Sequence, residues 1–222
     1  MMNIDLCGIC KEIRGTPILQ DITISLESGH IYGFKGKNGS GKTMLMRMIC
    51  GFIYPTSGTL LFDEKPLKRG DAPSFKIGAL IENPAFLLEY TGYENLKFLA
   101  SLQGDITDYE VREAIAQVGL SPNDERKYKK YSLGMKQRLG IAAAIMGTPD
   151  IVILDEPMNA LDEKGIAMVG QLILMLKQKG SLVILSNHDS QDLNQFSDEV
   201  FVLVDGKIVN SYIPAKHEEK IP

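Results

Sequence analysis

The sequence predicts an α/β domain built on a mainly parallel β-sheet. Short apolar runs rich in Ile, Val and Leu alternate with amphipathic stretches along most of the 222 residues, a pattern typical of this class. Two runs, Ile151–Leu154 and Leu182–Ile184, are apolar throughout, as expected of central strands buried on both faces. The predicted strands are Ile4–Cys10, Ile18–Leu26, Ile31–Gly36, Gly58–Phe62, Ile77–Ile81, Ile151–Leu154, Leu182–Ser186, Glu199–Val204 and Lys207–Tyr212.

One long segment departs from this alternation. Between Gly92 and Lys130 the apolar residues recur at helical spacing, as with Leu96 and Leu99, and no strand pattern is present. We therefore predict a helical lobe at about residues 91–140. No internal repeat or low-complexity stretch divides the chain, so we expect a single domain over residues 1–222.

Composition restricts the class of protein. With 44% hydrophobic and 23% charged residues, the chain can bury a substantial core, as a globular protein does. The longest apolar runs, Leu139–Gly147 and Ile151–Leu154, fall far short of the roughly 18 residues of a membrane-spanning helix. The N-terminus lacks the basic and apolar regions of a secretory signal, so we expect the protein to reside in the cytosol.

The charge and the cysteines exclude several kinds of site. A net charge of −4 argues against a broad nucleic-acid surface, and no direct nucleic-acid partner is expected. The basic run Arg126–Lys130 is interpreted as a solvated loop rather than a phosphate or lipid contact. Cys7 and Cys10 form a CxxC, but zinc needs two more ligands, and residues three apart in a strand point to opposite faces. Neither metal nor redox function is expected there.

A glycine-rich motif follows the third predicted strand and opens an apolar helix. Gly36–Thr43 reads GKNGSGKT and matches the phosphate-loop pattern G-x-x-x-x-G-K-[ST] completely. Its backbone N–H groups and the helix N-terminus favour a polyphosphate, Lys42 can reach the β- and γ-phosphates, and the Thr43 hydroxyl can ligate Mg²⁺. A glycine-rich turn without a ligand is the alternative, which the strand and helix context disfavours. The residues predicted to bind the nucleotide are Gly36, Asn38, Gly39, Ser40, Gly41, Lys42 and Thr43.

Two carboxylates follow the apolar strand Ile151–Leu154. Strand ends of an open α/β sheet line its ligand-binding edge, so Asp155 is predicted to hold Mg²⁺. Glu156 is then free to polarise the attacking water as the catalytic base, and Lys42 assists catalysis. The alternative, a solvent-facing acidic turn, is weak once the phosphate loop is accepted.

The order of these motifs resembles the nucleotide-binding domain of ABC proteins. Tyr131–Arg138 reads YSLGMKQR where that family has its signature LSGGQxQR; Ser132 and Gly134 match, whereas Leu133 and Met135 differ. The resemblance covers nearly the whole chain. It implies a P-loop NTPase of the ABC ATPase type, with an N-terminal antiparallel β part and a helical lobe, and with ATP and Mg²⁺ as cofactors.

The same resemblance implies how the site is assembled. In the family the signature of one subunit binds the γ-phosphate at the phosphate loop of another, so a second ATPase subunit is expected, with a homodimer favoured. Asn159–Asp162 resembles the D-loop that crosses this interface. His188 resembles the catalytic switch histidine that contacts the γ-phosphate, although a lone His after a strand is more often structural.

Two positions depart from the general family pattern. The aromatic residue that stacks on adenine in many members falls near Ile13 or Arg14, so the base would be held by apolar packing or by an Arg plane. The Gln of the Q-loop is replaced by Glu82. A carboxylate there is predicted to be a metal ligand, since hard cations prefer charged oxygen; a solvated acid is the alternative.

Glu82 in an IENPAF context, together with Tyr90–Leu96, is similar to a narrower group. These are exporters linked to bacitracin resistance and to self-protection against lantibiotics. The resemblance implies an ATP-hydrolysing subunit that powers a separately encoded membrane permease and exports a peptide antibiotic or other small amphiphile. Such a subunit would attach to the cytoplasmic face of the membrane through the permease.

Two other functions agree less well with the sequence than the transporter subunit does. A soluble ABC-type ATPase acting on nucleic-acid complexes usually has tandem ATPase domains or a coiled-coil insertion, and this chain has one domain, no heptad run and an acidic balance. A kinase or GTPase that shares only the phosphate loop leaves Ser132, Gly134 and His188 unexplained. The transporter subunit is the preferred hypothesis.

Overall fold

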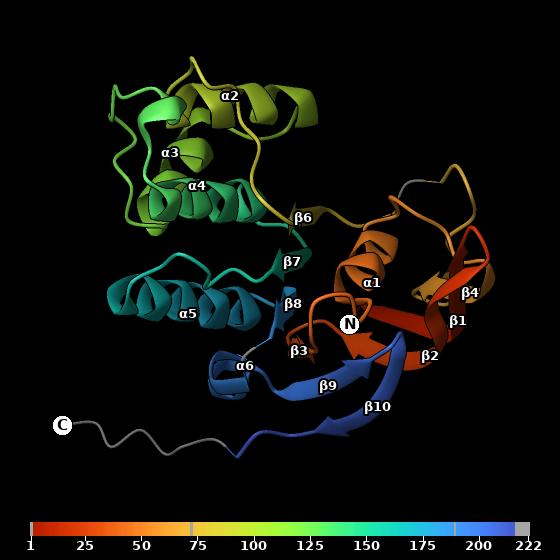
Figure 1. Ribbon diagram of the computed structural model, residues 1–222. Coiled ribbons are helices and arrows are strands. Elements are labelled where there is room, and N and C mark those ends of the chain that lie inside the picture. Colours follow the sequence, from red (N-terminus) through yellow and green to blue (C-terminus); the bar gives the residue numbers. More distant parts are fainter. Residues whose placement is uncertain (1, 72, 189, 216–222) are drawn as a thin grey trace.

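The computed structural model describes residues 2–71, 73–188 and 190–215 and contains a six-stranded and a four-stranded sheet (Figure 1). The larger sheet has the order β10-β9-β3-β8-β7-β6, and every neighbouring pair is parallel except β9 with β10. The predicted mainly parallel core is therefore confirmed. Its strands are β3 (Ile31–Lys35), β6 (Ile77–Leu80), β7 (Ile151–Asp155), β8 (Leu182–Asn187), β9 (Glu199–Val204) and β10 (Lys207–Tyr212).

The smaller sheet is antiparallel and has the order β2-β1-β4-β5, as the N-terminal antiparallel part was expected to be. Arg14 and Gly15, with φ of 52° and 77°, form the two-residue turn of the β1–β2 hairpin, the left-handed geometry that such turns require. The sequence patterns missed β5. The strands are β1 (Asn3–Ile13), β2 (Thr16–Glu27), β4 (Ser57–Phe62) and β5 (Lys65–Pro66).

A bulge in β1 corrects the prediction for the two N-terminal cysteines. Leu6 and Ile9 are both fully buried, because Gly8 has a φ of 59° and the pairing register shifts between Leu6 and Ile9. The extra residue places Cys7 and Cys10 on the same, outward face instead of on opposite faces. Within the described part of the chain, no three His, Cys, Asp or Glu residues gather as a metal site.

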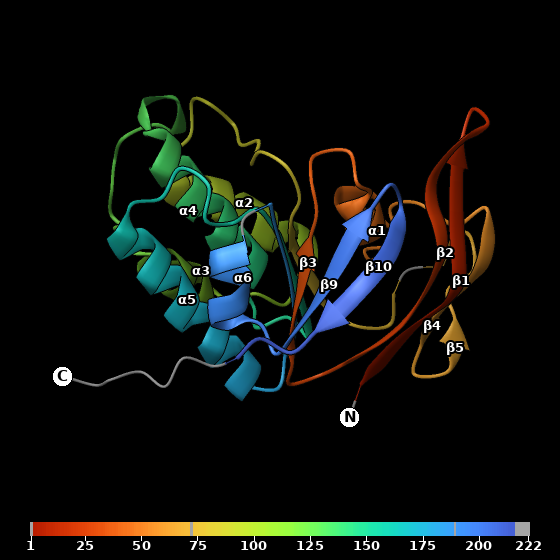
Figure 2. The same ribbon diagram turned by 60° about the horizontal axis from the view of Figure 1, so that its bottom comes forward.

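The two central strands separate two apolar cores. Val152 and Val183 join the core that includes α4 and α5, whereas Ile153 and Ile184 join the core beneath α1 and the antiparallel sheet. Figure 2 shows the antiparallel sheet on one side of the larger sheet and helices α2 to α5 on the other. Every residue of β7 and β8 is buried, which confirms the prediction of strands covered on both faces.

The predicted helical lobe contains three of the helices, two of which begin with a capping box. Thr91 and Glu94 cap α2, and Thr107 and Glu110 cap α3, so that each side chain satisfies a free backbone N–H. No helix in the described ranges is both long and apolar enough to span a bilayer. The helices are α1 (Lys42–Ile49), α2 (Gly92–Gln103), α3 (Asp108–Gln117), α4 (Leu133–Ile145), α5 (Glu163–Gln178) and α6 (Ser190–Phe196).

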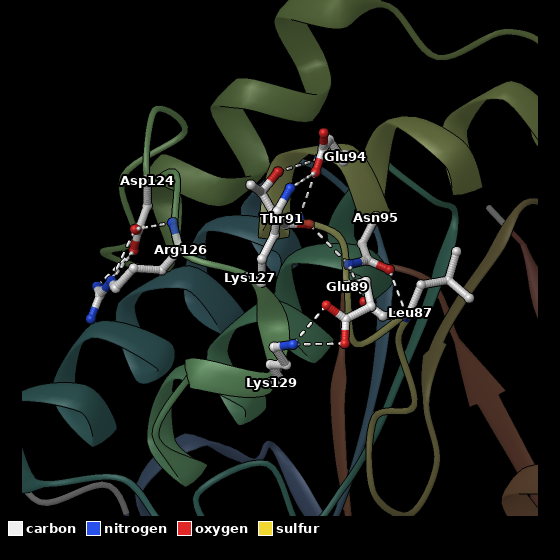
Figure 3. A network of polar contacts seen from close by, with 9 residues as sticks. All are labelled: Leu87, Glu89, Thr91, Glu94, Asn95, Asp124, Arg126, Lys127 and Lys129. Carbon is white, nitrogen blue, oxygen red and sulfur yellow. Dashed lines mark hydrogen bonds and ion pairs between the residues drawn. The ribbon is translucent and has the colours of Figure 1, made fainter.

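In the basic run Arg126–Lys130, three of the four cations pair with acidic neighbours. The run contains a 3₁₀ turn whose Tyr128 is buried, and these cations pair with carboxylates of the same lobe (Figure 3). The ion pairs are Arg126 with Asp124, Lys127 with Glu94 and Lys129 with Glu89. This local pairing agrees with the interpretation of the run as an exposed loop without a phosphate partner.

Replacing Gly78 by Ala should lower the free energy of unfolding by about 3 kcal/mol, because α4 packs directly on β6 at this point. An added Cβ would lie 1.7 Å from the Ala144 carbonyl oxygen, and both atoms belong to rigid elements. Urea denaturation measures the change. Gly104→Asn at the C-terminus of α2 is the control: Asn tolerates the left-handed conformation, and nothing lies within 4 Å, so its effect should stay below about 1 kcal/mol. Equal stability of Gly78→Ala and wild type would contradict this packing.

Candidate functional site

The glycine-rich loop connects the end of β3 to the start of α1, with the tight backbone that its sequence predicts. Gly39 and Gly41 have φ of 83° and 106°, conformations that cost residues with a Cβ free energy. At Gly36 a Cβ would lie 2.6 Å from the Leu203 carbonyl oxygen. These backbone angles and the close approach at Gly36 favour glycine at the three positions, and the loop leads into the N-terminus of α1.

Two polar side chains face the inside of this curl. Lys42 is only 5% exposed, and its Nζ donates to the carbonyl oxygens of Gly36 (2.7 Å) and Lys37 (3.2 Å), which hold the ammonium across the loop. The Ser40 hydroxyl is buried and has no hydrogen-bond partner within the described part of the protein. The Lys42 ammonium is held by neutral carbonyl oxygens, so an anionic phosphate oxygen would be a stronger partner for it. The loop therefore fits a phosphate group.

A cavity of about 520 Å³ opens beside the loop, within the size range of small-molecule sites. Its lining combines the phosphate loop with both predicted carboxylates and Glu82. Ile18 provides an apolar wall. The residues expected at the adenine, Ile13 and Arg14, do not line the cavity; they belong to the far end of the β1–β2 hairpin.

Asp155 joins the loop to the centre of the sheet. Its side chain accepts a 2.7 Å hydrogen bond from the Thr43 hydroxyl and a second one from the Ser186 hydroxyl, while the residue is only 8% exposed. One carboxylate beside one hydroxyl suits Mg²⁺, which commonly completes its octahedron with water and substrate phosphates. Thr43 and Asp155 thus fit the predicted metal site without a dense cluster of acids.

Glu82 lies in the same cavity but is engaged elsewhere. Its Oε1 accepts a 2.8 Å hydrogen bond from Arg47 of α1, and its side chain is 59% exposed. Glu82 also has a φ of 64°, which places this turn residue in the left-handed region. Its predicted role as a metal ligand would therefore use the other oxygen, Oε2, or displace Arg47 from Oε1.

Two predicted residues, Asn159 and His188, lie at the carboxylate of Glu156. Asn159 Nδ2 donates to Oε2 at 2.6 Å, and His188 Nδ1 lies 3.7 Å from Oε1, with the His side chain 59% exposed. The Glu156 N–H donates to the Ser186 carbonyl and hydroxyl oxygens at 3.2 and 3.1 Å. The arrangement places a potential base and its neighbouring amide in the lining of the cavity, with an exposed imidazole beside the base.

The signature residues lie apart from this cluster. Ser132 caps α4, where its hydroxyl accepts a 3.2 Å hydrogen bond from the Met135 N–H, and neither Ser132 nor Gly134 lines the cavity. A Cβ at Gly134 would lie 2.9 Å from the Ala160 carbonyl oxygen, so the signature packs against the segment that resembles the D-loop. Figure 1 shows α4 in the helical lobe, well separated from α1.

Sequence reasoning missed several residues of the site, including Ser186, Ile18 and Gln137. Ser186 ends a predicted strand two positions before His188, a place at the ligand-binding edge that was a usable signal. Ile18 lines the cavity from β2, and no local pattern marks it, whereas Gln137 lines the cavity from α4 and aligns with the second Gln of the signature LSGGQxQR, which was a usable signal. Both reach the site only through the tertiary fold.

The phosphate loop, the Thr43–Asp155 pair and the second carboxylate Glu156, placed at the edge of a parallel sheet, define a P-loop NTPase. Comparison with known proteins identifies the branch of that class. The ABC transporter family matches residues 19–159, well over half of the chain, and the protein belongs to this family. It is an ABC ATPase, as the sequence analysis expected.

Similar curated proteins agree with this assignment. The uncharacterized ABC transporter ATP-binding protein YybJ of Bacillus subtilis is 38% identical, over 94% of this chain and 95% of that protein. The bacitracin transport ATP-binding protein of Enterococcus faecalis is also 38% identical, and this chain covers 66% of its length. The lantibiotic transport ATP-binding protein of Streptococcus pyogenes is 33% identical over 86% of this chain and 82% of its own length. The predicted likeness to this group is confirmed.

Solved structures confirm the fold. The ATP-binding subunit of an ABC transporter superposes with a TM-score of 0.82 at 23% identity, covering 95% of this chain and 89% of its own. A dimeric ATP-binding cassette bound to ADP and Pi gives a TM-score of 0.86 at 21% identity, covering 96% of this chain and all of that one.

Replacing Thr43 by Val should remove most of the gain in ATP affinity that Mg²⁺ provides. Val keeps the shape of Thr but lacks the hydroxyl that bonds Asp155, so the expected loss is about tenfold or more. Titration with a fluorescent ATP analogue, once with Mg²⁺ and once with EDTA, separates the affinity for ATP alone from the gain in affinity that Mg²⁺ provides. Thr59→Val in the exposed part of β4 is the matched control. An unchanged Mg²⁺ effect in Thr43→Val would contradict the assignment of this metal site.

Proposed function

We propose that this ABC ATPase powers a separately encoded membrane permease that exports a peptide antibiotic or other small amphiphile. The separation of Ser132 and Gly134 from the phosphate loop of the same chain carries the proposal, because one copy holds two incomplete halves of a hydrolytic site. Two copies can complete two sites. The likeness to bacitracin and lantibiotic transport proteins supports the class of cargo.

In the proposed dimer, α4 of one copy points its N-terminus at the nucleotide of the other. The helix spans Leu133–Ile145, and its free backbone N–H groups carry partial positive charge that favours a γ-phosphate. Ser132 and Gly134 would add a hydroxyl and an N–H. Asn159–Asp162 lies beside Gly134 in the same copy, which supports its placement at the same interface.

Each catalytic side chain has a separate task in the proposed reaction. Lys42 and the loop N–H groups bind the phosphates, and Mg²⁺ held by Thr43 and Asp155 would neutralise developing charge. Glu156 orients a water and accepts its proton as the oxygen attacks the γ-phosphorus and ADP leaves. His188, beside Glu156, would contact the γ-phosphate.

The proposed location is the cytoplasmic face of the membrane, where the permease would hold the protein and ATP is available. The alternative, a soluble ABC-type ATPase acting on nucleic-acid complexes, would need a basic surface. The net charge is −4, and three cations of the run Arg126–Lys130 are paired with carboxylates. These observations favour the permease as the partner.

Replacing Glu156 by Gln should leave ATP binding intact and reduce kcat about 100-fold or more, because the amide keeps the shape but cannot accept the proton of water. Steady-state phosphate release and nucleotide titration measure the two quantities. Glu113→Gln on α3, where Glu113 accepts a hydrogen bond only from the Gln117 side chain, is the matched control and should keep wild-type kcat. Wild-type turnover in Glu156→Gln would show that the base has been assigned wrongly.

Purification from detergent-solubilised membranes of the native cell tests the transporter assignment itself. The tagged protein should recover a polytopic membrane protein in a stoichiometric amount, identified by mass spectrometry. That protein would be the permease and would define the cargo. Recovery only from the soluble fraction, with ribosomal or DNA-bound partners, would support the alternative function instead.

A further inference from the structure

Gln137 connects α4 to the main chain of the proposed base. The residue is only 8% exposed, and its Nε2 donates to the carbonyl oxygens of Glu156 (3.3 Å) and Pro157 (3.2 Å). Both carbonyl oxygens can only accept hydrogen bonds. The Gln137 side chain must therefore present its NH₂ group to them and donate one hydrogen to each oxygen. No other side chain described in the structure forms a hydrogen bond to either of these carbonyl oxygens.

The backbone that Gln137 contacts is strained. Glu156 has a φ of 49°, a left-handed conformation that is rare for a residue with a side chain and persists only where the surroundings enforce it. Ser186 binds the Glu156 N–H with two oxygens on one side, and Gln137 binds its carbonyl on the other. Hydrogen bonds on both sides of the residue therefore set the direction in which its carboxylate leaves the strand end.

Gln137 also belongs to the helix that begins with the signature. Lys136 N donates to the Ser132 carbonyl oxygen at 2.9 Å, so Gln137 lies just beyond the first turn. Arg138 pairs with Asp162 at 3.1 Å, but that contact is largely exposed and lies beyond the catalytic segment. Gln137 is thus the buried link between the signature helix and Glu156.

We propose that Gln137 is a positioning residue for ATP hydrolysis: it fixes the main chain of Glu156 so that the carboxylate faces the nucleotide cavity. The proposal rests on the proposed role of Glu156 as the base. Gln137 itself transfers no proton in this scheme. Its loss should therefore slow turnover while ATP binding, which depends on the phosphate loop, is retained.

The first test replaces Gln137 by Met, which has nearly the same length but no donor, and by Glu, which places an acceptor against the two carbonyl oxygens. We expect kcat to fall about 10- to 100-fold in the Met variant and further in the Glu variant, with KM for ATP within about twofold of wild type. Gln117→Met on α3 is the matched control, since Gln117 bonds only Glu113 on the helix surface. The concentration of nucleotide-binding sites is measured by titration, and turnover is divided by it. A loss of folded protein therefore does not lower the reported kcat.

The second test places Gln137→Met in the Glu156→Gln background and measures single-turnover hydrolysis of radiolabelled ATP. If Gln137 acts through Glu156, its loss should change this residual rate by less than about twofold. Wild-type turnover per site in Gln137→Met, or an equal fold-loss in both backgrounds, would overturn the proposal. Wild-type turnover in Glu156→Gln alone would instead show that the underlying assignment of the base has failed.

Discussion

The carboxylate of Asp155 is the point at which the parts of the site are joined. It accepts hydrogen bonds from Thr43 at the start of α1 and from Ser186 at the end of β8, so three segments that are distant in sequence meet at one buried charge. Burying a carboxylate is unfavourable unless such donors satisfy it. The position of the phosphate loop relative to Asp155 therefore depends on β8, which pairs with β3 on one side and with β7 on the other.

The strain at Glu156 follows from this arrangement. The chain must leave β7 directly after Asp155, and the left-handed conformation of Glu156 turns the next segment toward α4. Ser186 contacts both acidic residues: its hydroxyl donates to the Asp155 carboxylate, and its hydroxyl and carbonyl oxygens accept from the Glu156 N–H. Gln137 of α4 donates to the Glu156 carbonyl oxygen. A movement of this signature helix would therefore displace the main chain of the proposed base through the buried Gln137 side chain. In the proposed dimer, this would couple each signature to the hydrolytic site of its own chain.

The fold was predictable where the sequence carries strong local patterns. The strands β7 and β8 are continuous apolar runs, and the observed bounds of β9 and β10 are the predicted ones. The strand β5, Lys65–Pro66, left no signal because two residues cannot show an alternation. The bulge at Gly8 reverses the face of the residues that directly follow it, including Cys10, and a period of two counted along the sequence cannot detect an inserted residue.

The candidate site likewise contains residues that the sequence predicts and residues that it does not. The phosphate loop and Asp155 were predictable because consecutive residues or strand ends place them, whereas contacts between distant side chains leave no local pattern. Glu82 shows the difference: its position predicts a metal ligand, and the fold pairs it with Arg47. An exposed ion pair of this kind contributes only about 0–1 kcal/mol, so a divalent cation offering a stronger bond can displace the guanidinium. In the proposed metal site, Arg47 and the cation would thus bind the same carboxylate.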